Sequence, residues 1–430
     1  MKAAFYTLGC KVNQAESEYM AELLQKAGFE IVSPDERADF YIINSCTVTA
    51  TADQKTRQTV RKFKRHHPES AVILTGCMPQ AFPEEAKKLE QADIILGNKN
   101  DGDILSLIYK YLADKSRIID INQHETGEKF SECSVSSFGK RVRAFVKIED
   151  GCDRFCSYCI IPKSRGRVRS KPLQDLKREV STLAENGIKE IVLVGINLSA
   201  YGKNQNFNIA DAVEICAAES GITRVRLGSL EPDHITDDII ERLSEIKKFC
   251  PQFHISLQSG CDKTLKEMNR HYTAKEYEAL CRKLRSTFAD CTLTTDFMVG
   301  FTGETEEDFK ESLQFVKKTA FEKVHIFPYS QRTGTAASKH GDSVSKSEKE
   351  RRAAEAAAVT ERIRADYLKS QTGKTVKVLF EGKTKEGIYR GYTMNYIPVK
   401  VPSVKDITGL ELECTITGTD GEECTANLSS

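Results

Sequence analysis

The pattern of apolar and polar positions near the N-terminus repeats three times. The segments AAFYTLGC, FYIINSC and AVILTGC each run from a short apolar stretch into small or polar residues and end at a cysteine. A helical stretch follows each segment, and the first one, Gln14 to Ala27, has apolar residues at helical spacing before Gly28. Such strand–turn–helix units form a parallel sheet whose carboxyl ends meet at one edge. We therefore expect Cys10, Cys46 and Cys77 to converge there.

After residue 140, short apolar stretches alternate with charged helical stretches. The expected strands are 144–148, 191–194, 224–227, 254–257, 292–298 and 323–327. This alternation predicts a partial βα barrel, whose active site lies at the carboxyl ends of the strands. The candidate contacts to a nucleoside cofactor at these ends are Gly195, Ser256, Gln258, Asp296, Gly300 and Gly303. Each of them could equally be a turn glycine or a polar cap.

The C-terminal segment changes pattern. A charged, alanine-rich stretch from Ser343 to Gln371 predicts a connecting helix, and apolar and polar residues then alternate between glycine turns. That alternation predicts a small five-stranded β-barrel. The fold class is therefore α/β in three domains: an N-terminal parallel sheet in residues 1–125, a partial βα barrel in 138–368 and the small barrel in 371–430.

Composition favours a globular protein that binds metal. The 430 residues are 40% apolar and 29% charged, with 63 Lys or Arg against 62 Asp or Glu. A leader segment and an apolar run of about 18 residues are both absent from the sequence, so we expect a cytoplasmic protein that reaches no membrane. Fourteen cysteines in a reducing compartment are not a disulfide framework, and some of them are expected to hold metal.

The clearest metal motif is Cys152, Cys156 and Cys159, with Tyr158 before the third cysteine. A structural zinc site needs four ligands, whereas the next cysteine is the distant Cys216. Three thiolates on a 4Fe-4S cluster leave one iron open, which can chelate S-adenosylmethionine. The alternative for the three N-terminal cysteines is that they are ordinary buried core residues. Their recurrence at the same position in three successive units favours a second metal site instead. The cysteines that lack ligand spacing and are read as core are Cys216, Cys250, Cys261, Cys281 and Cys291.

Three basic stretches are candidates for RNA contact. They comprise Lys55, Arg57, Arg61, Lys62, Lys64 and Arg65; Lys163, Arg165, Arg167, Arg169 and Lys171; and the seven Lys or Arg of residues 371–405, including Lys377 and Arg390. Residues 371–405 also hold two Glu and the tyrosines Tyr389, Tyr392 and Tyr396, while 406–430 hold six acids and no base. Basic runs suit phosphate contact and tyrosines suit base stacking, although each run could be solvated surface. We expect the stretches to bind RNA together, with none sufficient alone.

The chain resembles the methylthiotransferase family over nearly its whole length. The resemblance rests on TLGCKVNQAES, INSCTVT, TGCMPQ, DGCDRFCSYCIIPKSRG, RVRLGSLEP, HISLQSGCDKTL and TTDFMVGFTGETEEDF. It implies an N-terminal domain with a three-cysteine cluster, a radical S-adenosylmethionine barrel and a C-terminal TRAM barrel. GCKVNQ and GYTMNY resemble the branch that modifies N6-threonylcarbamoyladenosine at position 37 of tRNA. One departure is Thr302, where the family commonly has Pro.

The resemblance also implies cofactors and partners. Two 4Fe-4S clusters are implied: the one on the middle three cysteines cleaves S-adenosylmethionine, and the one on the N-terminal three carries the sulfur. One S-adenosylmethionine would methylate that sulfur and a second would supply the 5′-deoxyadenosyl radical. The implied partners are tRNA, an electron donor such as flavodoxin or ferredoxin, and a sulfur donor.

Three alternatives stay open. The same chemistry could act on isopentenyladenosine in tRNA or on an aspartate of a ribosomal protein. Outside the enzymes, the alternative is a non-catalytic, metal-stabilised RNA-binding protein. Metal analysis separates the last one, because about eight iron and eight sulfide per chain support the enzyme and zinc alone supports the binder.

Overall fold

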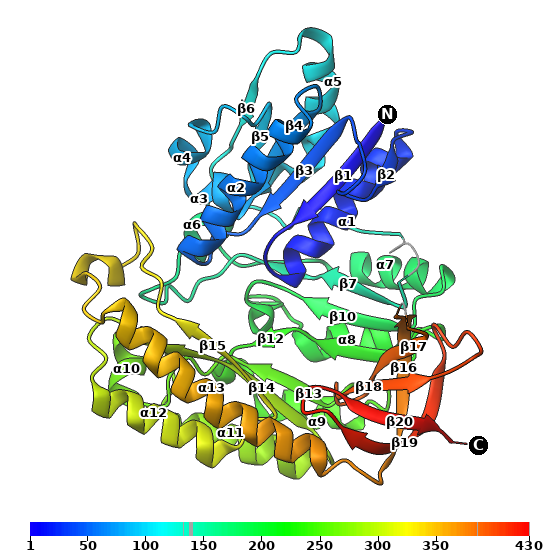
Figure 1. The fold of residues 1–430 in the computed structure, drawn as a ribbon, viewed down its shortest axis with the longest axis vertical. Helices are drawn as coiled ribbons and strands as arrows, with labels where there is room; N and C mark the ends of the chain where they lie inside the picture. The colour runs from blue at the N-terminus through cyan, green and yellow to red at the C-terminus, as the bar shows by residue number, and fades with distance from the viewer. Residues whose placement is uncertain (132, 137–140, 385, 430) are drawn as a thin grey trace.

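The structure is a computed structural model that describes residues 1–131, 133–136, 141–384 and 386–429. The N-terminal part stands above a curved middle part, and the C-terminal barrel lies at one side (Figure 1). The domain boundary expected at residue 138 and the basic residue Lys385 fall outside the described residues. Among the described residues, no helix has both the length and the apolar character needed to cross a membrane.

The N-terminal part is a parallel six-stranded sheet in the order β2-β1-β3-β4-β5-β6. Its strands are β1 (Lys2–Thr7), β2 (Glu30–Val32), β3 (Phe40–Ser45), β4 (Ala71–Gly76), β5 (Ile94–Leu96) and β6 (Ile118–Asp120). Its helices are α1 (Lys11–Lys26), α2 (Ala50–His66), α3 (Cys77–Ala81), α4 (Pro83–Lys87) and α5 (Ile104–Asp114). The predicted parallel sheet is confirmed, and the three strands that precede cysteines are its neighbours β1, β3 and β4.

Helices on both faces explain why β3 and β4 are buried along their whole length and begin with continuous apolar runs. Met20 of α1 and Ile108 of α5 pack on one face, while Val60 and Phe63 of α2 pack on the other. Every residue of β3 and β4 is buried as a result. Continuous apolar strands of this kind are typical of parallel sheets.

The middle part is an open half-barrel. Its wall strands are β7 (Arg143–Lys147), β10 (Glu190–Val194), β11 (Arg224–Leu227), β12 (Ser229–Leu230), β13 (Gln252–Ile255), β14 (Thr292–Val299) and β15 (Lys323–Pro328). They form a three-stranded sheet, β11-β10-β7, and a four-stranded sheet, β12-β13-β14-β15, whose described pairs are all parallel. Only Gly228 separates β11 from β12, so the two sheets continue as one curved wall. The short strands β8 (Glu149–Asp150) and β9 (Arg169–Ser170) pair beside it.

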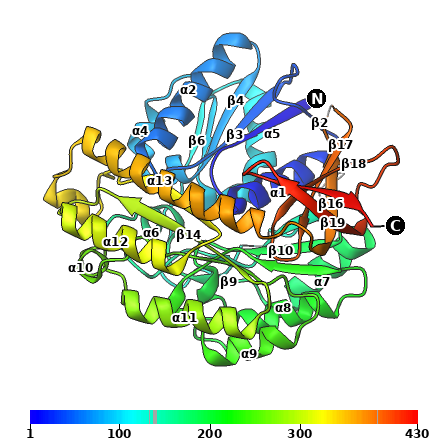
Figure 2. The same cartoon turned by 60° about the horizontal axis from the view of Figure 1, so that its bottom comes forward.

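A shell of helices covers the outer face of the wall (Figure 2). The helices of the middle part are α6 (Ile161–Arg165), α7 (Leu173–Glu185), α8 (Ile209–Ala218), α9 (Asp237–Glu245), α10 (Asp262–Glu267), α11 (Ala274–Thr287), α12 (Glu306–Thr319) and α13 (Lys346–Lys369). Alternate strand residues such as Leu193, Val225 and Leu293 pack against this shell. The intervening residues face the concave side, where Val192 and Val194 pack on Val12 and Ala15 of α1. The N-terminal part therefore closes the open side of the half-barrel.

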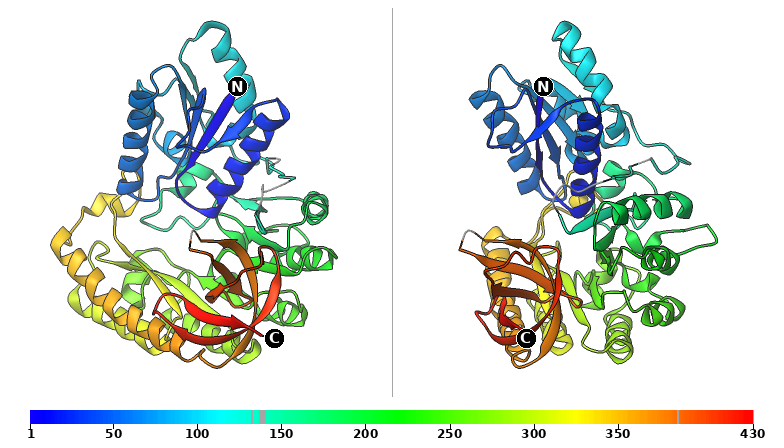
Figure 3. Two further views of the ribbon diagram at one scale, coloured as in Figure 1. Left: turned by 45° about the vertical axis from the view of Figure 1, so that its right-hand side comes forward. Right: turned by 90° about the vertical axis from the view of Figure 1, so that its right-hand side faces the viewer.

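The C-terminal part is the predicted closed five-stranded barrel, in the order β16-β17-β18-β20-β19. Its strands are β16 (Thr375–Lys383), β17 (Ile388–Thr393), β18 (Pro398–Pro402), β19 (Glu411–Thr419) and β20 (Cys424–Leu428). Figure 3 shows the barrel beside the half-barrel and below the N-terminal part. Arg224 of β11 is fully buried and holds it there, donating to the carbonyls of Tyr392 at 2.7 Å and Lys377 at 3.1 Å.

Candidate functional site

The three N-terminal cysteines lie together at the carboxyl edge of the sheet, as predicted. Cys10 caps the N-terminus of α1, Cys46 directly follows β3, and Cys77 is the first residue of α3 after β4. Burial raises the pKa of the Cys77 thiol to about 12, and the nearby Cys46 and Cys10 add to that rise. Because β1, β3 and β4 are neighbours in the sheet, the three cysteines lie at one part of its carboxyl edge.

Two buried asparagines join the first two cysteine turns. Asn13 of α1 donates to the side-chain oxygen of Asn44 at 2.9 Å, and Asn44 donates back to the Asn13 carbonyl at 2.9 Å. Cys10 Sγ donates to Asn13 Oδ1 at 3.2 Å. Gly9 allows the close approach, because a Cβ there would lie 3.3 Å from Cys46 Sγ and 2.8 Å from its Cβ.

The loop that carries the middle cysteines is held from several sides. The Cys152 N–H donates to the Gly166 carbonyl at 3.0 Å, and the Cys159 N–H donates to the Cys156 carbonyl at 3.0 Å. Gly151 has a φ of +85°, and a Cβ there would lie 1.9 Å from the Arg167 carbonyl oxygen, so only glycine fits. Cys152, Cys156 and Cys159 all belong to this loop, which runs from β8 to α6.

Each cysteine group receives a hydrogen bond from a buried arginine. Arg165 Nε donates to Cys77 Sγ at 3.2 Å, and Arg270 Nη1 donates to Cys156 Sγ at 3.2 Å. Arg165 is also paired with Glu16 of α1, and Arg270 with Glu231. N–H donors to cluster sulfurs are a known means of tuning an iron–sulfur centre, so both arginines suit that role.

The donor sets fit iron–sulfur clusters. Burial raises the pKa of the Cys152, Cys159 and Cys77 thiols, and a bound iron would supply the positive charge that converts them to thiolates. In the part of the chain that the structure describes, no group of three or more His, Cys, Asp or Glu is arranged around a single metal ion. Each cysteine of a four-iron cube binds a different iron, so the three sulfur atoms need not converge on a single metal ion.

One buried charge network joins the N-terminal cysteine group to the segment that follows the middle cysteine loop. Arg165 is the last residue of α6, the helix that follows Cys159, and reaches back to Cys77 and Glu16 of the N-terminal part. Lys147 of β7 is paired with Glu16 at 2.6 Å and with Asp150 at 2.7 Å. Burial alone would raise the pKa of Glu16, but Arg165 and Lys147 outweigh it and hold the pKa below its ordinary value.

The predicted cofactor contacts Gly195, Ser256, Gln258, Gly300 and Gly303 follow the carboxyl ends of β10, β13 and β14, whereas Asp296 lies within β14. Contact of any of them with S-adenosylmethionine stays a prediction. Tyr158 packs edge-on against Phe301 beside the cysteine loop. Ser256 is buried and bonds Ser229, and Asp296 pairs with His254 at 3.4 Å. Among these predicted contacts, Gln258, Gly300 and Gly303 have positive φ angles. The N–H groups of Gly300 and Gly303 donate to Glu304 and Ser343, which gives both glycines a turn function.

The end of β10 adds a feature that fits a bound ligand. Glu149 of β8 is fully buried beside Gly195, which follows β10, and burial raises the pKa of its carboxyl well above the ordinary value. Among the described residues, Glu149 Oε1 and Asn197 Oδ1 have no hydrogen-bond partner. Buried unpaired oxygens are uncommon, and the donors of a bound cofactor would satisfy them.

The structure corrects part of the basic run after the cysteine loop. Arg165, Arg169 and Lys171 are buried and paired with carboxylates, so their expected place on an RNA-binding surface was wrong. Lys163 and Arg167 are exposed. The sequence could not show the difference, because the carboxylate partners Glu16, Asp150 and Glu179 lie elsewhere in the chain.

The remaining basic candidates fall into two groups. Arg57 and Lys163 line one surface pocket of about 560 Å³ with Phe82, and Arg61 is exposed on the same helix as Arg57. In the barrel, Lys377 and Arg390 are exposed, but Arg390 pairs with Glu423 at 3.1 Å.

Acidic residues of the barrel neutralise part of its basic half, because Glu423 pairs with Arg390 and Asp420 pairs with Lys400. Tyr389 belongs to the barrel core, while Tyr392 and Tyr396 stack on each other with ring centroids 4.4 Å apart. The expected face of three free stacking tyrosines was therefore wrong for Tyr389.

Sequence reasoning missed several residues of the site. Asn13, Glu16 and Asn44 lie within the segments TLGCKVNQAES and INSCTVT, and Arg270 follows HISLQSGCDKTL. Their position in or beside these motifs was the available signal. Their roles depend on partners that are distant in sequence.

Two known family models together match most of the chain. Residues 2–97 match the Uncharacterized protein family UPF0004, and residues 146–316 match the Radical SAM superfamily.

Curated relatives match nearly the whole length. The chain is 35% identical to a threonylcarbamoyladenosine tRNA methylthiotransferase MtaB of Bacillus subtilis, over 94% of this chain and 91% of that protein. It is 39% identical to the protein of the same name from Thermotoga maritima, over 91% of this chain and 89% of that one. It is also 35% identical to a tRNA-2-methylthio-N(6)-dimethylallyladenosine synthase of Pseudothermotoga lettingae, over 91% and 90% of the two chains.

A solved structure shares the fold. The radical S-adenosylmethionine methyltransferase TsrM of Kitasatospora setae, with cobalamin and a [4Fe-4S] cluster bound, matches with a TM-score of 0.54 at 13% identity. The match covers 76% of this chain and 72% of that one. At this identity the likeness concerns the fold alone.

Proposed function

Because this chain belongs to the radical S-adenosylmethionine tRNA methylthiotransferases, we propose that it converts N6-threonylcarbamoyladenosine at position 37 of tRNA to its 2-methylthio derivative. The C2–H bond of adenine breaks in this conversion, and a bond to a methyl-bearing sulfur forms. Carbon 2 is neither acidic nor electrophilic enough for simple polar substitution, so a radical step is required. Its tRNA substrate places the reaction in the cytoplasm.

The middle cysteines would hold the 4Fe-4S cluster that binds S-adenosylmethionine. When bound, that cluster supplies the electron for reductive cleavage of the sulfonium. The chain's own residues orient the parts: Arg270 donates to Cys156, and Tyr158 packs on Phe301 beside the loop. Glu149 of β8, whose buried Oε1 has no hydrogen-bond partner among the described residues, suits a polar contact to the cofactor.

The N-terminal cysteines would hold the second 4Fe-4S cluster, which carries the sulfur. The observation that carries the whole proposal is the contact of Arg165, which follows the middle cysteine loop in sequence, with Cys77 of the N-terminal group. This contact supports sulfur delivery beside radical formation. The electron donor would be a flavodoxin or ferredoxin, and a separate donor would restore the sulfur.

The tRNA would lie over the exposed basic residues near this junction. Arg57 and Lys163 share a pocket between α2 and α6, and the exposed Phe155 stacks under Arg167 at 4.6 Å. Phosphate contacts and an exposed aromatic ring are the usual means of holding single-stranded loops of RNA. Because acidic and basic residues are mixed on the C-terminal barrel, its contribution to RNA binding would be smaller.

Dimethylallyladenosine is the second candidate substrate, because relatives named for it match the chain at 33–36% identity. Mass spectrometry of tRNA nucleosides from a deletion strain tests both. Loss of the 2-methylthio derivative of N6-threonylcarbamoyladenosine supports the proposal. Loss of only the dimethylallyl product would replace it with the second candidate.

A further inference from the structure

The turn after α10 is bound to the loop that carries the middle cysteines. The Ser157 N–H donates to the Met268 carbonyl at 3.0 Å, and the Asn269 side chain donates to the Phe155 carbonyl at 3.1 Å. Asn269 has a φ of +55°, a conformation that asparagine tolerates better than most residues. The turn is therefore held against the cysteine loop, and it fixes the place of its next residue, Arg270.

The Arg270 guanidinium is buried, and each of its three nitrogens has a partner. Nη1 donates to Cys156 Sγ at 3.2 Å, and Nε donates to the Tyr272 hydroxyl at 3.0 Å. Nη2 donates to the Ser256 carbonyl at 3.3 Å and pairs with Glu231. Because the planar guanidinium is held at every nitrogen, its Nη1–H stays directed at the sulfur.

Arg154 of the cysteine loop extends this contact into a buried charge network. Arg154 pairs with Asp233 and, at 3.3 Å, with Glu231, which also pairs with Arg270. Each arginine is 8% exposed, so dissolved ions screen the network only weakly. The two cations and the two carboxylates balance each other. Loss of a charge of either sign would therefore leave one uncompensated charge beside the Cys156 sulfur.

The sign of each charge decides its effect on a cluster that gains an electron. In the proposed reaction one electron leaves a low-potential donor protein, which is oxidised, and enters the 4Fe-4S cluster, which is reduced and gains one negative charge. A nearby cation and an N–H donor to a cluster sulfur stabilise the reduced form, whereas a nearby carboxylate destabilises it. Removing the charge of Arg270 and removing the charge of Glu231 should therefore shift the reduction potential in opposite directions.

We propose that Arg270 is a positioning residue that raises the reduction potential of the cluster on the middle cysteines, and that Glu231 limits this rise. The inference rests on the proposed function, which places a cluster on these cysteines. Arg270 acts through the Cys156 sulfur, and its effect is to make the cluster easier for the donor protein to reduce. Glu231 keeps the potential from rising so far that the reduced cluster would no longer cleave the sulfonium.

The test is a potentiometric titration of the full-length enzyme with both clusters, followed by electron paramagnetic resonance. The signal that changes when S-adenosylmethionine is added reports the middle cluster. In Arg270→Met the ratio of reduced to oxidised middle cluster at a fixed potential should fall about tenfold, as for loss of a charge-assisted hydrogen bond. A tenfold change is a midpoint about 59 mV lower for this one-electron couple.

Two further variants test the sign of the effect. Glu231→Gln should raise the same ratio about two- to fivefold, because Glu231 acts through the two arginines and not on the sulfur itself. Arg270→Lys keeps the charge but loses the planar set of donors, so its midpoint should lie between those of wild type and Arg270→Met.

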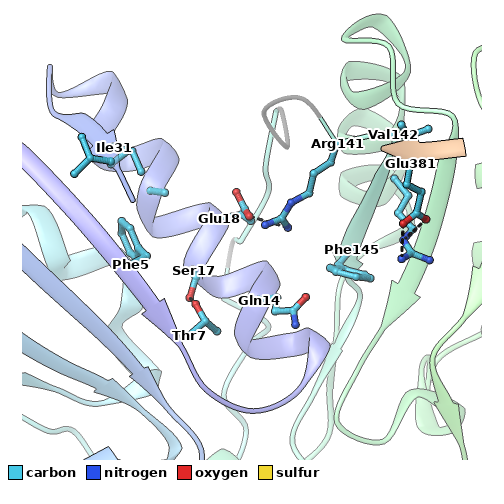
Figure 4. Close-up of a pocket in the computed structure, with 13 residues that line it drawn as sticks. Phe5, Thr7, Gln14, Ser17, Glu18, Ile31, Arg141, Val142, Phe145 and Glu381 are labelled. Atoms are coloured by element: carbon cyan, nitrogen blue, oxygen red, sulfur yellow. Dashed lines mark hydrogen bonds and ion pairs between the residues drawn. The ribbon is translucent and has the colours of Figure 1, made fainter. Parts of the chain in front are cut away.

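Arg141→Met is the matched control for loss of one arginine charge. Arg141 precedes β7, at the end of that strand opposite the cysteine loop, and its half-exposed side chain pairs with Glu18 across a surface pocket (Figure 4). Its loss should change the ratio by less than about twofold, because solvent screens an exposed and distant charge. The N-terminal cluster is an internal control, and its midpoint should be the same in wild type, Arg270→Met and Glu231→Gln.

The outcomes are distinct. An unchanged midpoint in Arg270→Met would overturn the inference. Shifts of Arg270→Met and Glu231→Gln in the same direction would also overturn it, because loosening of the loop alone predicts no opposition of sign. Iron content is measured for each variant, and if Arg270→Met loses iron, a lower midpoint in Arg270→Lys with a higher one in Glu231→Gln supports the inference and any other pair of shifts overturns it. A wild-type enzyme without any signal that responds to S-adenosylmethionine would overturn the proposed function itself.

Discussion

Replacing Glu16 with Gln should weaken the junction between the N-terminal part and the half-barrel. Glu16 is 1% exposed and pairs with both Arg165 and Lys147, which come from the other side of the junction. Removing one partner of a buried ion pair typically costs about 3–5 kcal/mol. Asp150 remains, 3.6 Å from Arg165 and 2.7 Å from Lys147, so we expect the low end, about 3 kcal/mol or roughly 150-fold.

The assay is urea unfolding followed by far-UV circular dichroism, because the chain contains no Trp. Glu18→Gln is the matched control, since Glu18 lies on the same helix and its pair with Arg141 is partly exposed at 2.9 Å. The free energy of unfolding of this control should fall by at most about 1 kcal/mol. Equal losses in the two variants would refute the argument that burial makes the Glu16 network important.

The pH dependence of the free energy of unfolding provides a second test of the Glu16→Gln variant. The pKa of Glu16 is lowered from 4.5 in the folded protein, so its contribution is present above the unfolded-state pKa and is lost as pH falls through the folded one. Wild type should therefore lose stability between about pH 5 and lower values more steeply than Glu16→Gln. Parallel acid profiles would contradict this assignment.

Three further predictions concern the cofactors, the barrel and the RNA. Cys152→Ala should abolish cleavage of S-adenosylmethionine and keep about half the iron, whereas Cys77→Ala should spare cleavage and stop methylthio transfer, as measured by 5′-deoxyadenosine and nucleoside analysis. Arg224→Met should cost about 3 kcal/mol at the barrel interface and make the barrel easier to release by limited proteolysis, with cleavage of S-adenosylmethionine unchanged. An Arg57→Ala, Lys163→Ala double variant should flatten the salt dependence of tRNA binding by about 1.4–1.8 units of slope, and an unchanged slope would place the RNA elsewhere.

The sequence by itself determined the elements and the positions of the cysteines. Strand and helix periodicity is local, so the three repeated units predicted the parallel sheet, and Cys10, Cys46 and Cys77 lie at its carboxyl edge as expected. The middle strands agree with the prediction to within two residues at most ends, and the alternation after Gln371 predicted a closed barrel. The CxxxCxxC spacing needs no tertiary partner to be recognised.

Only the tertiary structure decided which charged residues are interior. Arg165 and Arg167 are two positions apart in one basic run, yet Arg165 is fully buried and Arg167 is exposed. The difference comes from Glu16, which is 149 positions away from Arg165 in sequence. A charged side chain can be buried only where folding brings a partner to it, and no local pattern records that partner.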